Sequence, residues 1–309
     1  MRRVWVSLMS VLLMAGSARA SVYYVTVAGL GGEPDYEQRF TAAAKDLDKL
    51  FKAAGDAGHV FTLSGAQATK AQLTGVLAGV ARDAKASDDL VVILIGHGSF
   101  DGVEYKFNLV GPDITAAELA GLCDKVAAKR QLIVDTTSSS GGAVAALERP
   151  GRAVIAATKS GTEKNATVFA RYWVEALQDP GADMDKSDSI SAMEAFVYAD
   201  RKTANFYESQ KRLATEHAEF EDTGRGQAVR SPDRSEGVML SSFTVLRIGA
   251  SQKAANDPAK RALLDKKEEL EQKIDALKYG KAAMDPGDYK KQLTDALLQL
   301  AKVQQELDK

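Results

Sequence analysis

The sequence predicts an α/β fold in which a mostly parallel sheet is flanked by helices and is followed by an α-helical hairpin. Two observations predict it. Short apolar runs alternate with amphipathic stretches from residue 21 to about residue 250, and a long charged segment rich in Lys, Glu, Leu and Ala follows. Alternating strands and helices are typical of a parallel sheet covered by helices. The domains expected are therefore residues 21–250 and the hairpin of residues 251–309.

The first twenty residues have the three parts of a secretory signal peptide. Two arginines follow Met1, an apolar run extends over residues 4–16, and Ala18-Arg19-Ala20 is a small-x-small cleavage site. The apolar run is short for a bilayer span, which disfavours the alternative of a membrane anchor. We expect removal of residues 1–20, a mature chain that begins at Ser21 without a membrane span, and export to the periplasm or secretion.

The composition excludes several classes of protein. Hydrophobic residues make up 45% of the chain and charged residues 27%, as in globular proteins. Removal of three arginines with the signal peptide leaves 37 basic against 42 acidic residues, a net charge of −5, and no nucleic-acid motif is present, so we expect no nucleic-acid partner. Cys123 is the only cysteine, which excludes an intrachain disulfide and a cysteine-based zinc site.

The strands are predicted from the short apolar runs. They are residues 22–28, 59–63, 90–95, 131–134, 153–157 and 243–248. A helix over 36–54 places its apolar residues on one face, and Thr115 and Glu118 form a capping box that opens another helix. Cys123 lies on the apolar face of that second helix, which indicates a buried small residue rather than a nucleophile.

The hairpin is predicted from two helix starts. Asp257-Pro258 and Asp285-Pro286 each fit an N-cap followed by a proline in the first helical position. The two helices would meet in a coiled-coil-like seam. Its residues are Leu263, Leu270, Ile274 and Leu277 on one helix and Leu293, Ala296, Leu300, Val303 and Leu307 on the other. The hairpin would pack on its own domain, join two copies into a homo-oligomer, or act as a recognition arm.

Candidate catalytic residues follow two successive strands. Ligands of open α/β sheets bind beyond the carboxyl ends of the strands. The run 90–95 is followed by His97-Gly98, and the run 131–134 by Asp135 and a Thr/Ser run over residues 136–140. Successive strands often lie side by side, so we expect His97 and this run to converge as a base and a nucleophile would.

These two motifs resemble those of the legumain and caspase group of cysteine peptidases. In that group one apolar strand ends in His-Gly, and the next ends in an acidic residue, a small residue and the catalytic cysteine. His97-Gly98 matches the first motif, and Asp135-Thr136-Thr137 matches the second with Thr137 at the cysteine position. The similarity covers about residues 22–177 and is closer to legumains. It implies a caspase-type fold, a base at His97, and an oxyanion site formed by the backbone amides of Gly98 and Thr137.

The threonine at the cysteine position leaves three functions open. A hydroxyl needs a well-placed base, so loss of the thiol predicts a catalytically inactive peptidase homologue that binds peptide or protein segments. The alternative is an active hydrolase in which His97 activates Thr137, or else Ser138 or Ser139. The third is an assembly protein that acts through the hairpin. If neither chemistry applies, the Thr/Ser run is a polar loop that caps the helix near Ala143.

Residues 183–194 fit the calcium-binding loop of an EF-hand. The oxygen donors of positions 1, 3, 5, 7, 9 and 12 would be Asp183, Asp185, Ser187, Ser189, Ser191 and Glu194. Asp188 stands at the sixth position, where glycine normally makes the sharp turn, and Asp tolerates the left-handed conformation better than most residues. The alternative is an acidic loop that caps a helix beginning near Ser191. Ca²⁺ is the only cofactor expected, in a structural role.

Overall fold

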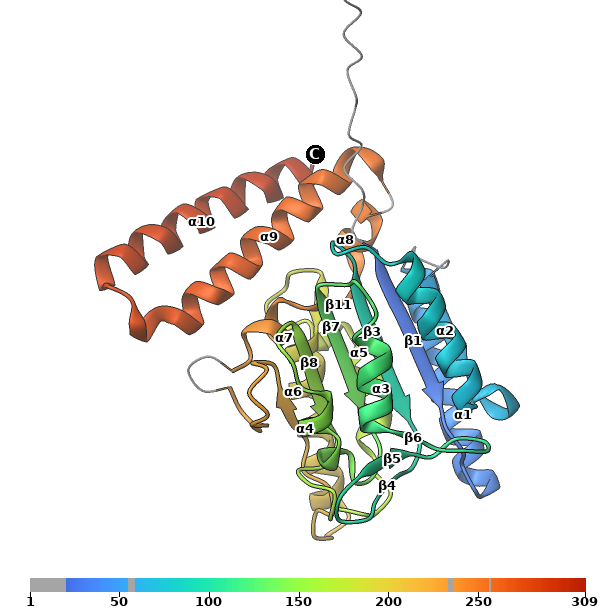
Figure 1. Ribbon diagram of the computed structural model, residues 1–309. Helices are drawn as coiled ribbons and strands as arrows, with labels where there is room; N and C mark the ends of the chain where they lie inside the picture. Colours follow the sequence, from blue (N-terminus) through green and yellow to red (C-terminus); the bar gives the residue numbers. More distant parts are fainter. Residues whose placement is uncertain (1–20, 55–58, 233–235, 256) are drawn as a thin grey trace, which may run out of the picture.

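The computed structural model describes residues 21–54, 59–232, 236–255 and 257–309 (Figure 1). The predicted signal peptide lies outside these described residues. Over the described part of the chain, no helix combines the length and the apolar character that a membrane span requires.

The core is a six-stranded sheet with the strand order β10-β8-β7-β3-β1-β2. All neighbours are parallel except β10, which pairs antiparallel with β8 at the edge. The strands are β1 (Val22–Ala28), β2 (Val60–Leu63), β3 (Asp89–Ile95), β7 (Arg130–Asp135), β8 (Arg152–Ala156) and β10 (Glu219–Glu221). The five parallel strands match the predicted runs to within one residue at each end. Parallel strands buried on both faces carry continuous apolar runs, and this is the signal that the sequence contains.

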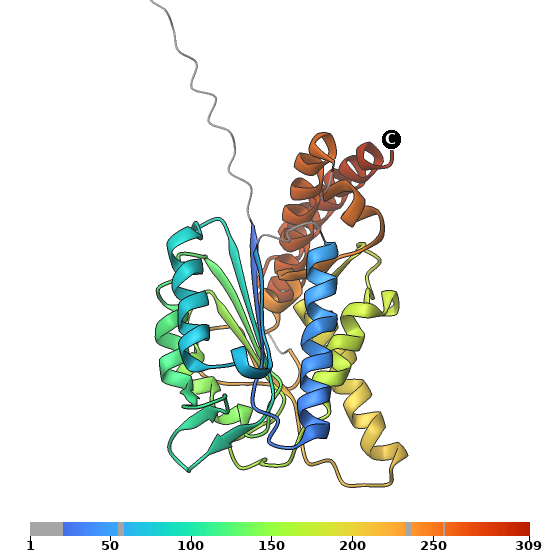
Figure 2. The same ribbon diagram turned by 90° about the vertical axis from the view of Figure 1, so that its right-hand side faces the viewer.

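Helices cover both faces of this sheet (Figure 2). One face, here the α1 face, carries α1 (Pro34–Ala53), α5 (Phe169–Gln178) and α6 (Ala192–Ser209). The other, the α2 face, carries α2 (Lys70–Asp83), α3 (Ala116–Cys123) and α4 (Val144–Leu147). Side chains alternate along a strand, so Ile93 and Ile95 of β3 belong to the α1 face and Val92 and Leu94 to the α2 face.

A local signal explains where α3 begins. The predicted capping box at Thr115 and Glu118 is present at the start of α3. Cys123 lies at the end of the same helix and is fully buried, as predicted. Burial raises the pKa of its thiol to about 11, so this cysteine carries no thiolate at neutral pH.

Two small sheets lie outside the central one. Strands β4 (Gly98–Phe100), β5 (Tyr105–Phe107) and β6 (Ile114–Thr115) form an antiparallel sheet that follows β3 and was not predicted. The last predicted strand forms as β11 (Thr244–Arg247) but pairs with β9 (Ser189–Ser191) rather than joining the central sheet. Val245 and Leu246 are buried in the core of the α1 face, so the apolar side chains of this run leave water without joining the central sheet.

The C-terminal helices α9 (Pro258–Gly280) and α10 (Pro286–Leu307) lie side by side as a hairpin (Figure 1). The predicted N-caps are present, because the side chains of Asp257 and Asp285 accept hydrogen bonds from the first turns. Seam residues Leu270, Ile274, Leu277 and Ala296 are buried, and Leu264 rather than Leu263 is the buried leucine near the start of α9. Helix α7 (Val238–Ser242) precedes β11, and α8 (Gly249–Ala255) joins β11 to α9. Both helices contact α9.

Candidate functional site

The two motifs lie side by side at the carboxyl edge of the sheet. Strands β3 and β7 are neighbours, with Leu94 paired to Asp135. Beyond the strands, the Ser138 hydroxyl donates to the Gly98 carbonyl over 2.9 Å and accepts from the Gly98 amide over 3.2 Å. A side chain at position 98 would lie 2.5 Å from Thr137 Oγ1, so the close approach requires glycine. The structure thus brings the backbones of the two motifs together.

The imidazole of His97 lies on the α1 face. Its ring packs edge-on against Tyr36 and Phe40 of α1, with centroids 4.6 and 5.2 Å away. Partial burial lowers the pKa of His97, and the nearby Gly31 backbone and Glu33 oppose that shift. The lowered pKa favours the neutral form of the ring on this side of the sheet.

The hydroxyl of Thr137 lies on the α2 face. It is fully buried, lies 2.6 Å from the Tyr105 hydroxyl, and donates to the Ser138 carbonyl over 3.0 Å. Asp135, the last residue of β7, lies on the same face, because it pairs with Leu94, whose side chain belongs to the core of the α2 face. His97 and Thr137 therefore make their side-chain contacts on opposite faces of the sheet. Among the described residues they share no hydrogen bond.

The other hydroxyls of the Thr/Ser run are buried as well. Thr136, Ser138, Ser139 and Ser140 are each at most 3% exposed. Ser139 has a left-handed backbone with φ of 60°, and its Oγ has no hydrogen-bond partner within the described part of the chain. The turn that connects β7 to α4 is thus packed into the protein rather than open to a substrate.

The backbone amides that the resemblance assigns to an oxyanion site are both in use. The amide of Gly98 donates to the Ser138 hydroxyl, and the amide of Thr137 donates to Asp135 Oδ1 over 3.1 Å. An oxyanion site needs donors that are free to bind the developing charge. In this structure both donors already bind oxygens of the protein.

Among the acids near these two strand ends, Asp135 has the pKa that is raised furthest, and the sequence predicts only its place in the motif. It is fully buried, and its Oδ2 has no hydrogen-bond partner among the residues described. Burial raises its pKa to about 6, although hydrogen bonding from Tyr105 and Thr137 opposes the shift. Burial likewise raises the pKa of Tyr105 well above its usual value. In the sequence, the signal for such a buried acid is an acidic residue at the end of an otherwise apolar strand.

A cavity of about 490 Å³ lies beside His97 on the α1 face. We name it the α1–α5 groove. Its apolar walls are Tyr36, Phe40 and Ala43 of α1, Val168 and Val174 at α5, and Phe206 of α6, and Ile95 of β3 also lines it. Two of these residues, Tyr36 and Phe40, are the ones that contact His97. The sequence does not reveal the groove, because its walls come from three helices that are far apart along the chain.

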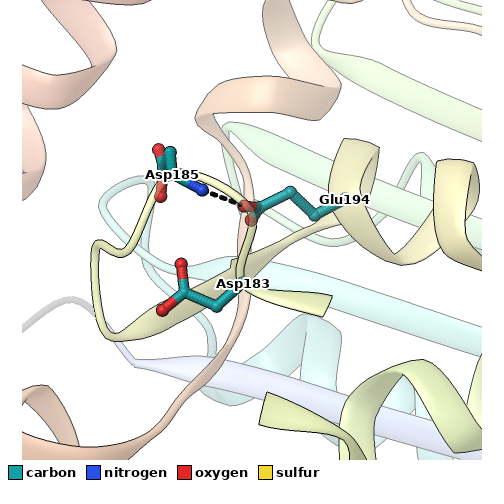
Figure 3. A group of neighbouring side chains, drawn as sticks. All are labelled: Asp183, Asp185 and Glu194. Carbon is teal, nitrogen blue, oxygen red and sulfur yellow. Dashed lines mark hydrogen bonds between the residues drawn. The ribbon is translucent and has the colours of Figure 1, made fainter. Parts of the chain in front are cut away.

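The acidic loop gathers three of its predicted ligands (Figure 3). Carboxylate oxygens of Asp183, Asp185 and Glu194 all lie within 4.8 Å of one another. Asp188, at the glycine position of the EF-hand pattern, has the left-handed conformation with φ of 61°. Burial raises the pKa of Glu194, and the Asp185 carboxylate adds to that rise. The capping box that the alternative interpretation requires is also present, between Ser191 and Glu194.

The remaining predicted ligands also lie in this loop. The hydroxyls of Ser187 and Ser189 are 2.9 Å apart, and the Ser189 carbonyl accepts from Ser187 Oγ over 3.5 Å. The side chain of Ser191 is bound to Glu194 Oε2 over 2.9 Å. Lys267 of α9 donates to the Ser187 carbonyl over 2.6 Å, so the loop is in contact with the hairpin.

Comparisons with known proteins give matches among solved structures alone. No protein-family model and no curated protein matches the chain. The initiator caspase Dronc of Drosophila is 12% identical, with 67% of this chain and 81% of that chain covered and a TM-score of 0.44. Caspase-1 of Spodoptera frugiperda is 11% identical, with 70% and 92% covered and a TM-score of 0.46. A protein from Geobacter sulfurreducens is 15% identical, with 74% and 99% covered and a TM-score of 0.48. These are likenesses of the fold alone.

Proposed function

We propose that this protein is an exported peptidase homologue that has no peptidase activity and binds peptide or protein segments beside His97. The observation that carries the absence of activity is the burial of every hydroxyl from Thr136 to Ser140. A nucleophile must be reached by the substrate and by its base. Thr137 instead contacts Tyr105 on the face opposite to His97.

The proposal of peptide binding is supported by the α1–α5 groove. The groove adjoins the carboxyl edge of the sheet, the position where open α/β sheets bind ligands. Its volume falls within the range of about 300–1,000 Å³ that is typical of ligand pockets, and its walls are mainly apolar.

Cleavage profiling by mass spectrometry tests the absence of activity. We expect the mature chain, incubated with a diverse peptide mixture, to produce no new cleavage products. The Thr137→Cys variant should also be inactive, because its thiol would lie against Tyr105 and away from His97. Cleavage by the wild type that is lost in both His97→Ala and Thr137→Ala would instead establish a hydroxyl-dependent peptidase. Turnover by Thr137→Cys would contradict the opposite-face arrangement.

We also propose that the loop 183–194 binds Ca²⁺. Two observations favour it over a simple helix cap: the convergence of three carboxylates, and the left-handed backbone at Asp188, where the EF-hand pattern requires it. Asp183, Asp185 and Glu194 would hold the ion together with oxygens of the three serines. Since the loop contacts the hairpin through Lys267, the ion would stabilise that junction.

Titration calorimetry of the mature chain with CaCl₂ tests this proposal. We expect a binding heat that is lost in Asp183→Ala, which removes a carboxylate from the cluster. The matched variant Asp188→Gly relieves the left-handed backbone without removing a proposed ligand, and should bind at least as tightly as the wild type. Identical titrations of the wild type and Asp183→Ala would show that the loop is only a helix cap.

A further inference from the structure

We propose that α10 pairs with α10 of a second copy of this chain, with the two helices antiparallel and related by a two-fold axis. The inference goes beyond the proposed function, because it assigns a partner to the hairpin and depends on neither peptide nor calcium binding. The surface that would pair is the side of α10 that faces away from α9, here the α10 outer face. Its central residues are Thr294, Leu298, Ala301 and Gln305, and all four are exposed.

The hairpin leaves this face uncovered. Helix α9 lies between α10 and the α/β domain and packs against α7 and α8, so α10 is the outer helix (Figure 1). On α10, Ala296 is buried in the seam with α9. Leu298 is two residues further, about 200° around the helix, and is 58% exposed. Helix α10 therefore has a second face, opposite the seam, that the rest of the described chain leaves exposed.

The charges of α10 are complementary to those of its own reversed copy. An antiparallel helix centred between residues 298 and 299 places Asp295 opposite Lys302 of the second copy. The same register brings position 291 to 306, position 288 to 309, and position 290 next to 308. Every charged residue of 286–309 then meets an opposite charge; these exposed residues are Asp288, Lys290, Lys291, Asp295, Lys302, Glu306, Asp308 and Lys309. A parallel copy would place each charge beside its equal, so the pattern selects the antiparallel orientation.

These charges are not neutralised by ion pairs within the hairpin. Over the described residues, the ion pairs of the hairpin are made by α9, either with Arg247 of β11 or between residues of α9 itself. Asp295 and Lys302 are therefore available to a second copy. Exposed ion pairs are individually weak, but a two-fold axis forms each of them twice, and together they fix the orientation of the pair.

Leu298 supplies the apolar contact at the centre of the pair. In an antiparallel coiled coil of this register, it lies against Ala301 of the second copy, and Ala301 lies against Leu298 of that copy. Thr294 and Ala301 have small side chains, so the two backbones can approach closely. Leu297, which is also exposed, lies at the edge of the same face. Pairing would thus remove exposed leucine side chains from water.

Charge reversal tests the pairing, with sedimentation equilibrium of the mature chain over a range of concentrations. We expect the mass of the wild type to rise from one copy to two as the concentration increases. Asp295→Lys and Lys302→Asp, each alone, put like charges opposite each other and should raise the dissociation constant of the dimer at least about tenfold. An equal mixture of the two variants should associate to within about threefold of the wild type. One variant then has lysine and the other aspartate at both positions, so every facing pair is again opposite in charge.

Lys273→Asp is the matched control, because it makes the same change of charge at an exposed position of α9 outside this face. It should leave the dissociation constant unchanged. Leu298→Ala should raise the constant about tenfold through lost apolar contact. Raising NaCl from about 0.1 M to about 1 M should also weaken the dimer, because salt screens exposed charges. Circular dichroism and thermal unfolding verify that each variant is folded.

Three results would contradict the proposal. The wild type would remain monomeric at every concentration, or neither single variant would weaken the dimer, or the mixture would associate as poorly as each variant alone. The third result would show that α10 contributes to the dimer in an orientation other than antiparallel. None of them bears on the proposed peptide or calcium binding, because neither ligand is present in the measurement.

Discussion

Replacing Arg152 with methionine is expected to lower the free energy of unfolding by about 3 kcal/mol, the largest effect we expect from a single substitution. Arg152 is 1% exposed and lies on β8. Its guanidinium donates to Gln131 Oε1 and to the Leu147 carbonyl, each over 2.9 Å, and to Asp124 Oδ1 over 2.7 Å. Methionine fills much of the same space but leaves Gln131 Oε1 and the Leu147 carbonyl, which are both buried, without this donor.

Arg149→Met is the matched control for Arg152→Met. Arg149 binds the same Asp124 Oδ1 over 2.9 Å, but its side chain is 43% exposed. Exposed ion pairs contribute little, so we expect a loss below about 1 kcal/mol. Urea unfolding of both variants measures the difference. Equal losses in the two would show that the surface ion pair, and not the buried network, accounts for the effect of Arg152.

Asp135→Asn is expected to stabilise the protein above pH 6 by up to about 3 kcal/mol, and to have little effect below pH 4. The raised pKa, about 6 instead of 3.8, means that the folded protein binds the proton more tightly than the unfolded chain does. The free energy of unfolding therefore falls as the pH rises from about 4 to about 6, because the buried carboxyl must ionise. Asparagine preserves an acceptor for the Thr137 amide and has no charge to bury.

Urea unfolding at a series of pH values tests this expectation, and the informative quantity is the difference between variant and wild type. Asp46→Asn serves as the control, because Asp46 is exposed on α1 and its replacement should give a small difference at every pH. A gain from Asp135→Asn that is the same at pH 4 and pH 8 would mean that ionisation of Asp135 is not its source.

The burial of Asp135 also bears on the proposed function. Asp135, Tyr105 and Thr137 form a closed cluster on the α2 face, beneath the strand end where a peptidase would need an open nucleophile. The expected pH dependence of stability and the proposed absence of cleavage would therefore both follow from this one arrangement. Activity would require this cluster to open.

Much of the fold was predictable because it rests on local patterns. The apolar run of β3 predicts a buried strand because it is short, continuous and rich in Val and Ile. The capping box of α3 and the N-caps of the hairpin depend on residues within one helical turn. The short strands β4, β5 and β6 were missed because two or three residues carry no usable periodicity.

The site was predictable only in part. The order of its motifs placed His97-Gly98 and the Thr/Ser run at the ends of two strands, and the structure confirms that these strands are neighbours. The α1–α5 groove was not predictable, because Phe40, Val174 and Phe206 meet only when three helices pack on one face of the sheet. The burial of the hydroxyls likewise depends on Tyr105, which is supplied by a strand of a different sheet.

Local patterns predict the five parallel strands of the central sheet, several helix caps and the residues that follow two of these strands. Which side chains meet depends on packing between elements that are distant along the chain. The register between β3 and β7 pairs Leu94 with Asp135 and brings the two motifs together. Beyond the ends of these strands, contact with Tyr105 holds Thr137 on the α2 face, and contacts with Tyr36 and Phe40 hold His97 on the α1 face. These contacts join residues that are far apart along the chain, so local patterns do not specify them.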